Sequence, residues 1–167
     1  MVGPRRRARE IALQVLHVMD VSPELSADAA LARTFGHLVT SRGLVEDEDD
    51  ALEPQDDGES SPARADRALV EELVRGYETH RAALDETLAG LSRNWRVERM
   101  AVVERNIIRL ALWELHHAPQ VPVTVVLDEA IELCKRFGTA EGAAFVNGLL
   151  DRAVAEMPGK PSAPSSR

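Results

Sequence analysis

Apolar residues recur at helical spacing along most of the chain. In the N-terminal stretch they stand three and four positions apart, which is the period of one face of an α-helix. These residues are Ala8, Ile11, Ala12, Val15, Leu16 and Met19. Pro4 suits the first turn of such a helix, where a missing N–H has no consequence, and Ser22 with Pro23 interrupts the pattern. A first helix is therefore expected between Pro4 and Ser22.

Two further helices are expected in the middle of the chain. One runs from about Ser26 to Gly43, a residue type that commonly ends helices. Its apolar face carries Leu31, Phe35, Leu38 and Val39. The next begins at Ser61 and Pro62, as a capping and a first-turn residue. Its stripe carries Leu69, Leu73, Tyr77, His80, Leu84, Leu88 and Leu91. Gly76 inside this stripe costs about 1 kcal/mol against alanine, so we expect a close helix crossing there.

The C-terminal half continues the helical pattern. A short helical turn is expected at residues 97–100, and residues 103–115 form the most apolar helix, which we expect to be central. Pro119 and Pro122 end it. The β-branched residues 121–126 are typical of a strand. Helical spacing nevertheless continues through the residues that follow, which predicts a helix ending at Gly138. Its stripe carries Val126, Leu127, Ala130, Ile131, Cys134 and Phe137.

The last helix carries Ala144, Phe145, Val146, Leu149, Leu150 and Ala153. Asn147 and Gly148 are normally a turn signal, but the apolar period around them is unbroken, so we expect Gly148 to permit tight packing. The pattern thus predicts an all-α chain of about seven helices. We expect a single domain over residues 1–157, with an acidic flexible loop at 44–61 and a disordered tail at 158–167.

Charge is distributed unevenly along the 167 residues. The formal net charge is −8, from 28 acidic and 20 basic residues. Nine of the acids stand in residues 46–59, where there is no base. With that segment set aside, 20 basic and 19 acidic residues remain, a net charge of +1. The acidic balance therefore does not exclude a nucleic-acid binder, and the acidic loop is expected to discourage non-specific RNA binding.

The strongest local chemical feature is a cluster of four arginines, Arg5, Arg6, Arg7 and Arg9. Guanidinium groups are planar, permanently charged donors that suit phosphate. Positive charge is unfavourable at a helix N-terminus, so the cluster favours a polyanion ligand over a merely solubilising helix start. Gln14, seven positions after Arg7, lies on the same broad face and is able to bond a base edge, although an ordinary exposed residue is the simpler interpretation for glutamine alone.

Two phenylalanines flank the small-residue segment 138–142, where an exposed aromatic ring is able to stack on a base. We expect Phe137, on the apolar stripe, to be a core residue, and Phe145 to be the more open of the two.

No enzymatic motif, cofactor site or metal site is evident. His116 and His117 point about 100° apart on a helix, and neither has a histidine or cysteine four positions away; with His37 and His80 they are expected to be surface or half-buried. Cys134 is the only cysteine and is expected in the core. No apolar run is long enough to cross a membrane. A cytoplasmic protein is therefore expected.

Several blocks together resemble the NusB family of bacterial transcription antitermination factors. They are Arg5–Arg6–Arg7–Ala8–Arg9–Glu10 with Ala12, Gln14 and Leu16, then residues 103–115, Val121 with Pro122, residues 128–133, Phe137 with Gly138, and residues 145–151. The similarity covers about residues 4–155 apart from the acidic loop.

The resemblance implies two packed three-helix bundles with a short extra helix, and no catalysis. It implies binding of the boxA element of ribosomal RNA leader transcripts together with NusE, a small-subunit ribosomal protein. The complex would join RNA polymerase elongation complexes with other Nus factors and prevent premature termination.

Site residues follow from the positions that match the family. The implied RNA-binding residues are Arg5, Arg6, Arg7, Arg9, Gln14, His17 and Phe145, with Glu141 as an acidic residue that restrains RNA affinity. The implied partner-binding residues are His17, Glu104 and Arg109. His17 departs from the tyrosine that is commoner in the family.

Two alternatives stay open at this point. One is an RNA-independent protein-interaction module whose arginines bind an acidic partner. The other is the NusB-like domain of a ribosomal RNA methyltransferase, for which the Pro/Ser-rich residues after the last helix leave no room in this sequence.

Overall fold

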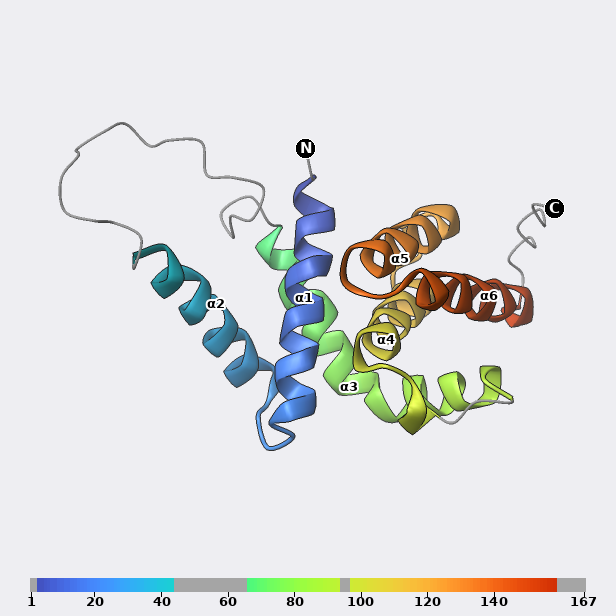
Figure 1. Cartoon of the computed structure of the whole chain (residues 1–167), viewed down its shortest axis with the longest axis horizontal. Coiled ribbons are helices and arrows are strands. Elements are labelled where there is room, and N and C mark those ends of the chain that lie inside the picture. The colour runs from blue at the N-terminus through green and yellow to red at the C-terminus, as the bar shows by residue number, and fades with distance from the viewer. Residues whose placement is uncertain (1–2, 44–65, 94–96, 159–167) are drawn as a thin grey trace. The chain divides into compact units, whose positions relative to one another are not determined.

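The structure is a computed structural model that describes residues 3–43, 66–93 and 97–158, although not the side chains of residues 39–43. Across these ranges the chain forms six α-helices, one short 3₁₀ helix and no strand (Figure 1). They are α1 (Pro4–Val21), α2 (Ala27–Gly43), α3 (Arg67–Leu91), η2 (Val97–Arg99), α4 (Val102–His117), α5 (Val123–Phe137) and α6 (Ala140–Glu156). The prediction of an all-α fold with about seven helices is confirmed.

The chain divides into two compact units, Met1–Arg75 and Gly76–Arg167, and the boundary falls inside α3. The first unit holds α1, α2 and the beginning of α3. The second holds the rest of α3, followed by η2, α4, α5 and α6. Each unit therefore draws on three or more helices, which agrees with the expected pair of helical bundles.

The apolar face of α1 is buried as the spacing predicts, since each of the six residues of its stripe is at most 3% exposed. Pro4 occupies the first turn, after Gly3. The N–H of Asp66 donates to the Pro4 carbonyl oxygen at 3.2 Å, which ties the start of α1 to the residue before α3.

Side-chain caps mark where α2 and α3 begin. The Ser26 hydroxyl accepts a hydrogen bond from the Ala29 N–H at 3.3 Å, and the Asp66 carboxylate accepts one from the Leu69 N–H at 3.0 Å. Ser61 and Pro62, the predicted start of the third helix, lie outside the described residues; the helix that carries the stripe begins at Arg67. That stripe is buried throughout, except for the half-buried His80.

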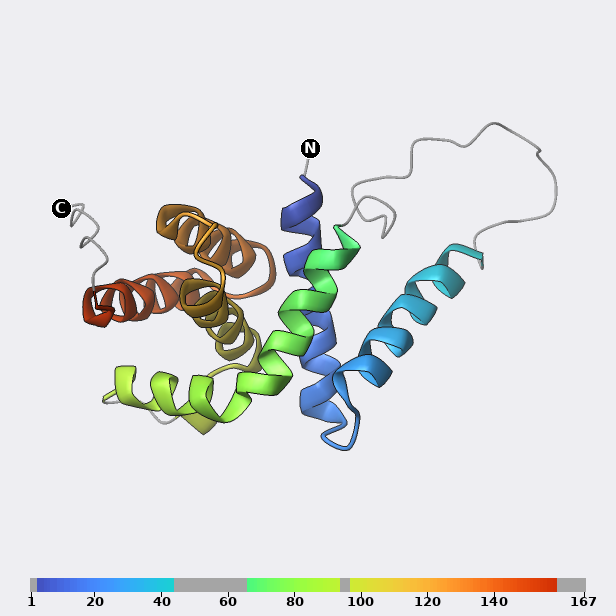
Figure 2. The same ribbon diagram turned by 180° about the vertical axis from the view of Figure 1, so that it is seen from behind.

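In the second unit α4 is the central helix, as predicted. It packs on α5 and α6, which also pack on each other (Figure 2). Gly76 of α3 lies against this helix, because a Cβ atom placed there would overlap the indole ring of Trp113. The close helix crossing predicted at Gly76 is therefore confirmed.

The segment that is typical of a strand, residues 121–126, is helical from Val123 onward, because its apolar residues follow the helical period into α5. Val126, Leu127, Ala130, Leu133 and Cys134 are buried, and Gly138 follows the helix as its cap. The prediction that Phe137 is a core residue is wrong, since 38% of it is exposed. Phe137 is the last residue of α5, so no following turn of helix covers its ring.

α6 begins after Thr139, whose hydroxyl accepts a hydrogen bond from the Gly142 N–H at 2.9 Å. The helix continues through Asn147 and Gly148, as the unbroken period predicts. The expected tight packing at Gly148 is wrong, because a Cβ atom there would meet no atom within 4 Å. The packed face of α6 is formed by Val146, Leu149, Leu150, Ala153 and Val154 instead.

Within the described ranges, no helix is both long and apolar enough to cross a membrane. The predicted acidic loop at 44–61 and residues 159–167 of the predicted tail lie outside the described residues.

Candidate nucleic-acid interface

The four arginines at the start of α1 differ in exposure. Arg5 is exposed and Arg6 is half-buried, whereas Arg7 and Arg9 are buried. The reason is geometric: consecutive residues of a helix point about 100° apart, so four arginines in five positions surround the helix and cannot share one face. The exposed positive charge of the cluster is therefore concentrated on Arg5 and Arg6.

Arg7 and Arg9 take part in contacts within α1. The Arg7 Nη1 donates to Glu10 Oε2 at 2.6 Å, and the two side chains are 6% and 1% exposed. The Arg9 Nη1 donates to the Arg5 carbonyl oxygen at 3.5 Å. Removing one partner of a buried ion pair leaves the other charge uncompensated, so Arg7 has a structural role whatever else it does.

Gln14 and His17, the other predicted RNA-binding residues of α1, are both exposed. Gln14 does not form one exposed surface with Arg7, because Arg7 is buried. There is no acidic residue in the first turn of α1, so the guanidinium of Arg5 adds to the positive end of the helix dipole. This end of α1 favours anions.

The second unit carries the remaining predicted RNA-binding residues, Glu141 and Phe145. Both are exposed on α6, Phe145 by 37%. They stand four positions apart, so they lie on the same face of the helix, one turn from each other. An exposed aromatic ring thus has a carboxylate beside it, as the predicted restraint on RNA affinity requires.

Beside these two residues is a pocket of about 250 Å³, which is also lined by Glu104 at the beginning of α4. Glu104 is only 6% exposed, and its Oε2 accepts no hydrogen bond in the described part of the chain. Its carboxylate fills the space in front of Gly142, where a Cβ atom would overlap it. Burial raises the pKa of the neighbouring Cys134 thiol to about 12, and the Glu104 charge adds to that effect.

Arg109 is held by a network inside the second unit. Its Nε and Nη2 donate to the two carboxylate oxygens of Asp85 at 2.7 and 2.9 Å, and its Nη1 donates to Asn106 Oδ1 at 2.9 Å. The Arg109 side chain is 5% exposed, and that of Asp85 is 34% exposed. Arg109 is therefore buried, and the partly exposed group of this pair is the Asp85 carboxylate that it orients. The partner role assigned to Arg109 stays a prediction.

Comparison with known proteins decides the family. A sequence model of the NusB family matches residues 6–155. This chain belongs to the NusB family. The transcription antitermination protein NusB of Anaeromyxobacter dehalogenans is 42% identical over 158 residues, which cover 95% of each chain. That of Geotalea uraniireducens is 37% identical over 159 residues, covering 95% of this chain and 99% of the relative. The solved structure of T. maritima NusB has a TM-score of 0.70 at 28% identity and covers 93% of this chain and 94% of that chain.

The histidines of this NusB-family chain are at the surface or half-buried, as predicted. The rings of His80 and His117 stack with centroids 3.9 Å apart. Partial desolvation lowers the pKa of His117 although its side chain is exposed, and repulsion by His80 and His116 lowers it further. Among the described residues, no group of three or more potential ligands is placed to hold a metal ion.

The sequence predictions passed over two arginines of the second unit, Arg93 and Arg152. Both line a second groove that Phe145 also lines. A signal for one of them was present, because Arg152 stands seven positions after Phe145 and therefore shares its face of α6. Arg93 follows the last turn of α3, and its sequence neighbourhood carries no comparable signal.

Proposed function

We propose that this NusB-family chain is a transcription antitermination factor that acts in the cytoplasm by binding and not by catalysis. It binds the boxA element of ribosomal RNA leader transcripts together with NusE, the small-subunit ribosomal protein. With other Nus factors it then joins RNA polymerase elongation complexes and prevents premature termination. The names of the relatives support the antitermination activity, and the exposed cationic and aromatic side chains support the RNA contact.

The observation that carries the RNA proposal is the exposure of Phe145. Burying a phenylalanine side chain is favourable by about 1.5–3 kcal/mol, yet 37% of Phe145 is exposed near the N-terminal end of α6. Stacking on a nucleobase would cover the exposed part of the ring and tolerates any base, because every base has a π-face. Arg5 and Arg6 supply charge for phosphate, and Gln14 and His17 supply exposed polar groups on the same helix.

The partner contact is proposed for His17 directly, and for Glu104 and Arg109 indirectly, through neighbouring groups. His17 is exposed on α1, and its imidazole is able to hydrogen-bond or stack. Glu104 and Arg109 are buried, so we propose that they position neighbouring groups, with the Asp85 carboxylate presented by Arg109.

The test is a fluorescence-anisotropy titration of boxA RNA and of a scrambled RNA, with and without NusE. Phe145→Leu should weaken boxA binding by about 5- to 150-fold, the range expected for one lost stacking contact. Phe137→Leu is the matched control, because Phe137 is 38% exposed against 37% for Phe145, and its affinity should stay at the wild-type value.

Charge variants test the same proposal in the same titration. Arg5→Gln should weaken binding and reduce the slope of log affinity against log salt by about 0.7, the value for one phosphate of a single strand. Arg5 is the suitable arginine to replace, because loss of Arg7 would remove an ion-pair partner of the buried Glu10 carboxylate. Glu141→Gln should tighten binding by removing a repulsive charge. NusE binding with no RNA binding under any condition would instead establish a protein-interaction module.

A further inference from the structure

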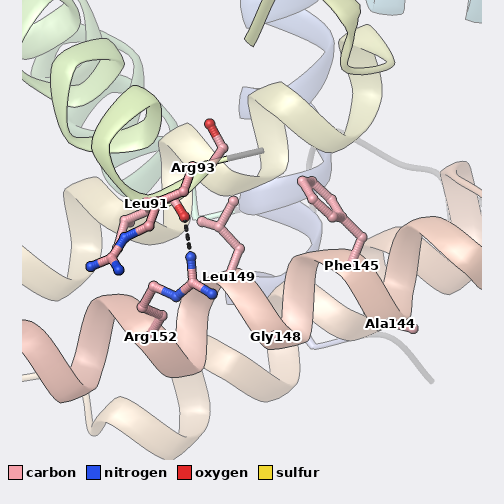
Figure 3. Close-up of a pocket in the computed structure, with 8 residues that line it drawn as sticks. Leu91, Arg93, Ala144, Phe145, Gly148, Leu149 and Arg152 are labelled. Carbon is pink, nitrogen blue, oxygen red and sulfur yellow. Dashed lines mark hydrogen bonds between the residues drawn. The ribbon is translucent and has the colours of Figure 1, made fainter. Parts of the chain in front are cut away.

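A second groove on the second unit has a volume of about 620 Å³ (Figure 3). We call it the α3–α6 groove, after the two helices whose residues line it. The lining residues are Leu91, Ser92, Arg93, Ala144, Phe145, Gly148, Leu149 and Arg152. The volume is in the range of sites that hold small molecules and cofactors.

The groove follows one face of α6. Phe145, Gly148, Leu149 and Arg152 stand at successive steps of three and four positions, so they form one row along the helix. Figure 3 shows the Phe145 ring at one end of this row and the Arg152 guanidinium at the other, with Leu149 between them. The row spans about 10 Å at the helical rise per residue. An aromatic ring and a cation are thus separated by a short apolar stretch.

Gly148 keeps the middle of the row bare. It is exposed, and a Cβ atom at this position would meet no atom within 4 Å. Glycine in a helix interior costs about 1 kcal/mol against alanine, and the described structure contains no neighbour that would require it. Glycine allows a ligand to approach the helix backbone closely, and such a ligand would explain the glycine at this position.

The polar part of the groove is cationic. Arg152 Nη1 donates to the Leu91 carbonyl oxygen at 2.6 Å, which holds its guanidinium across the groove while other N–H groups stay available. Arg93 is exposed, and its Nη2 is 3.9 Å from Glu156 Oε1, a weak surface pair. None of the eight lining residues is acidic. Two guanidinium groups without an acid in the lining favour an anionic ligand.

We propose that the α3–α6 groove holds the nucleotide next to the one that stacks on Phe145. Its sugar lies over Gly148 and Leu149, and its phosphate bonds Arg152 and Arg93. This inference rests on the proposed function, because Phe145 is both the proposed base-stacking residue and a lining residue of the groove. The groove is continuous with the proposed stacking residue Phe145, and its lining is positively charged. Both features favour a single RNA strand over a peptide.

The first test fills the groove without disturbing the fold. Gly148→Leu introduces a side chain where the protein leaves open space, so the melting temperature should stay the same or rise. Affinity for boxA RNA should fall about tenfold, as for the loss of one charge-assisted contact. Gly36→Leu in α2 is the matched control, since Gly36 is also an exposed helical glycine with no atom within 4 Å of an added Cβ.

The second test removes the charge. Arg152→Gln should weaken boxA binding and reduce the salt slope by about 0.7. Lys135→Gln, an exposed cation of α5 that pairs with Glu132, should change neither. When boxA RNA is shortened from each end in turn, one truncation should remove the groove nucleotide, and the wild type and Arg152→Gln should then bind with equal affinity.

Each outcome separates the groove from the general RNA proposal. If the wild type binds boxA RNA and Phe145→Leu weakens it, but Gly148→Leu and Arg152→Gln bind as the wild type does, the groove proposal is overturned while the proposed function stands. If Gly148→Leu impairs binding of NusE in the absence of RNA and leaves RNA affinity unchanged, the occupant is a protein segment and the proposal is wrong. If the wild type ignores RNA with and without NusE, both proposals fall together.

Discussion

Replacing Gly76 by alanine tests the closest contact of the second unit. The added methyl group would overlap three atoms of the Trp113 indole, and Trp113 is 5% exposed, so the rigid ring has little room to move away. Overpacking of this kind costs about 1–3 kcal/mol. The change also removes the helix penalty of glycine, a gain of about 1 kcal/mol. We therefore expect a net loss of up to about 2 kcal/mol in the free energy of unfolding.

The measurement is urea unfolding followed by circular dichroism, together with thermal melting, for Gly76→Ala and Gly90→Ala. Gly90 lies in the same helix but has no atom within 4 Å of an added Cβ, so Gly90→Ala should raise stability by up to about 1 kcal/mol. Gly76→Ala should lower the melting temperature by up to about 8 °C, and Trp113→Leu should cost less stability in the Gly76→Ala background than in the wild type. If both glycine variants gained stability equally, the close crossing would be refuted.

Three further predictions concern buried or titrating groups of the second unit. Arg109→Lys should lower the free energy of unfolding by about 1–3 kcal/mol, because an ammonium cannot replace the two parallel hydrogen bonds to Asp85; unchanged urea unfolding would contradict this. Because the pKa of His117 is lowered in the folded state, the unfolded chain binds the proton more readily, and the stability associated with this group is lost as pH falls below its ordinary value of 6.5. His117→Gln should therefore melt with a smaller difference between pH 7.5 and pH 5.5 than the wild type, by a modest amount since His117 is exposed. Cys134, with a pKa of about 12, should react with a thiol reagent at pH 8 only as fast as the protein unfolds, so rapid labelling of the native protein would show that its burial is wrong.

Much of the fold follows from local pattern. The helical period locates α1, α4, α5 and α6 because each buries one continuous stripe, and such a stripe has to recur with the turn of the helix. The same argument rejects a strand at residues 121–126, whose β-branched residues continue into the apolar face of α5. Gly76 interrupts the apolar stripe of α3, and the close neighbour predicted there is the Trp113 indole.

The errors occur where the pattern is the same but the surroundings differ. Phe137 continues the stripe of α5, yet it is the last residue of the helix and is exposed. Gly148 and Gly76 both interrupt apolar helices, but one lies against an indole and the other against open space. Spacing along one helix does not reveal whether another helix covers that face, so these residues required the packed structure.

The candidate RNA site also has features that follow from the sequence and features that required the structure. The sequence by itself determined that the chain is helical, that four of its 20 basic residues cluster at the start of α1, and which family it resembles, because each depends on residue type and order alone. Only the tertiary structure decided that Arg5 is exposed while Arg7 and Arg9 are buried, and that Arg109 is buried against a partly exposed Asp85. It also brought the residues after α3 beside α6, where Arg93 and Arg152 line a groove with Phe145. The physical reason is that charge belongs to a residue, whereas exposure and partners depend on how helices distant in sequence pack together.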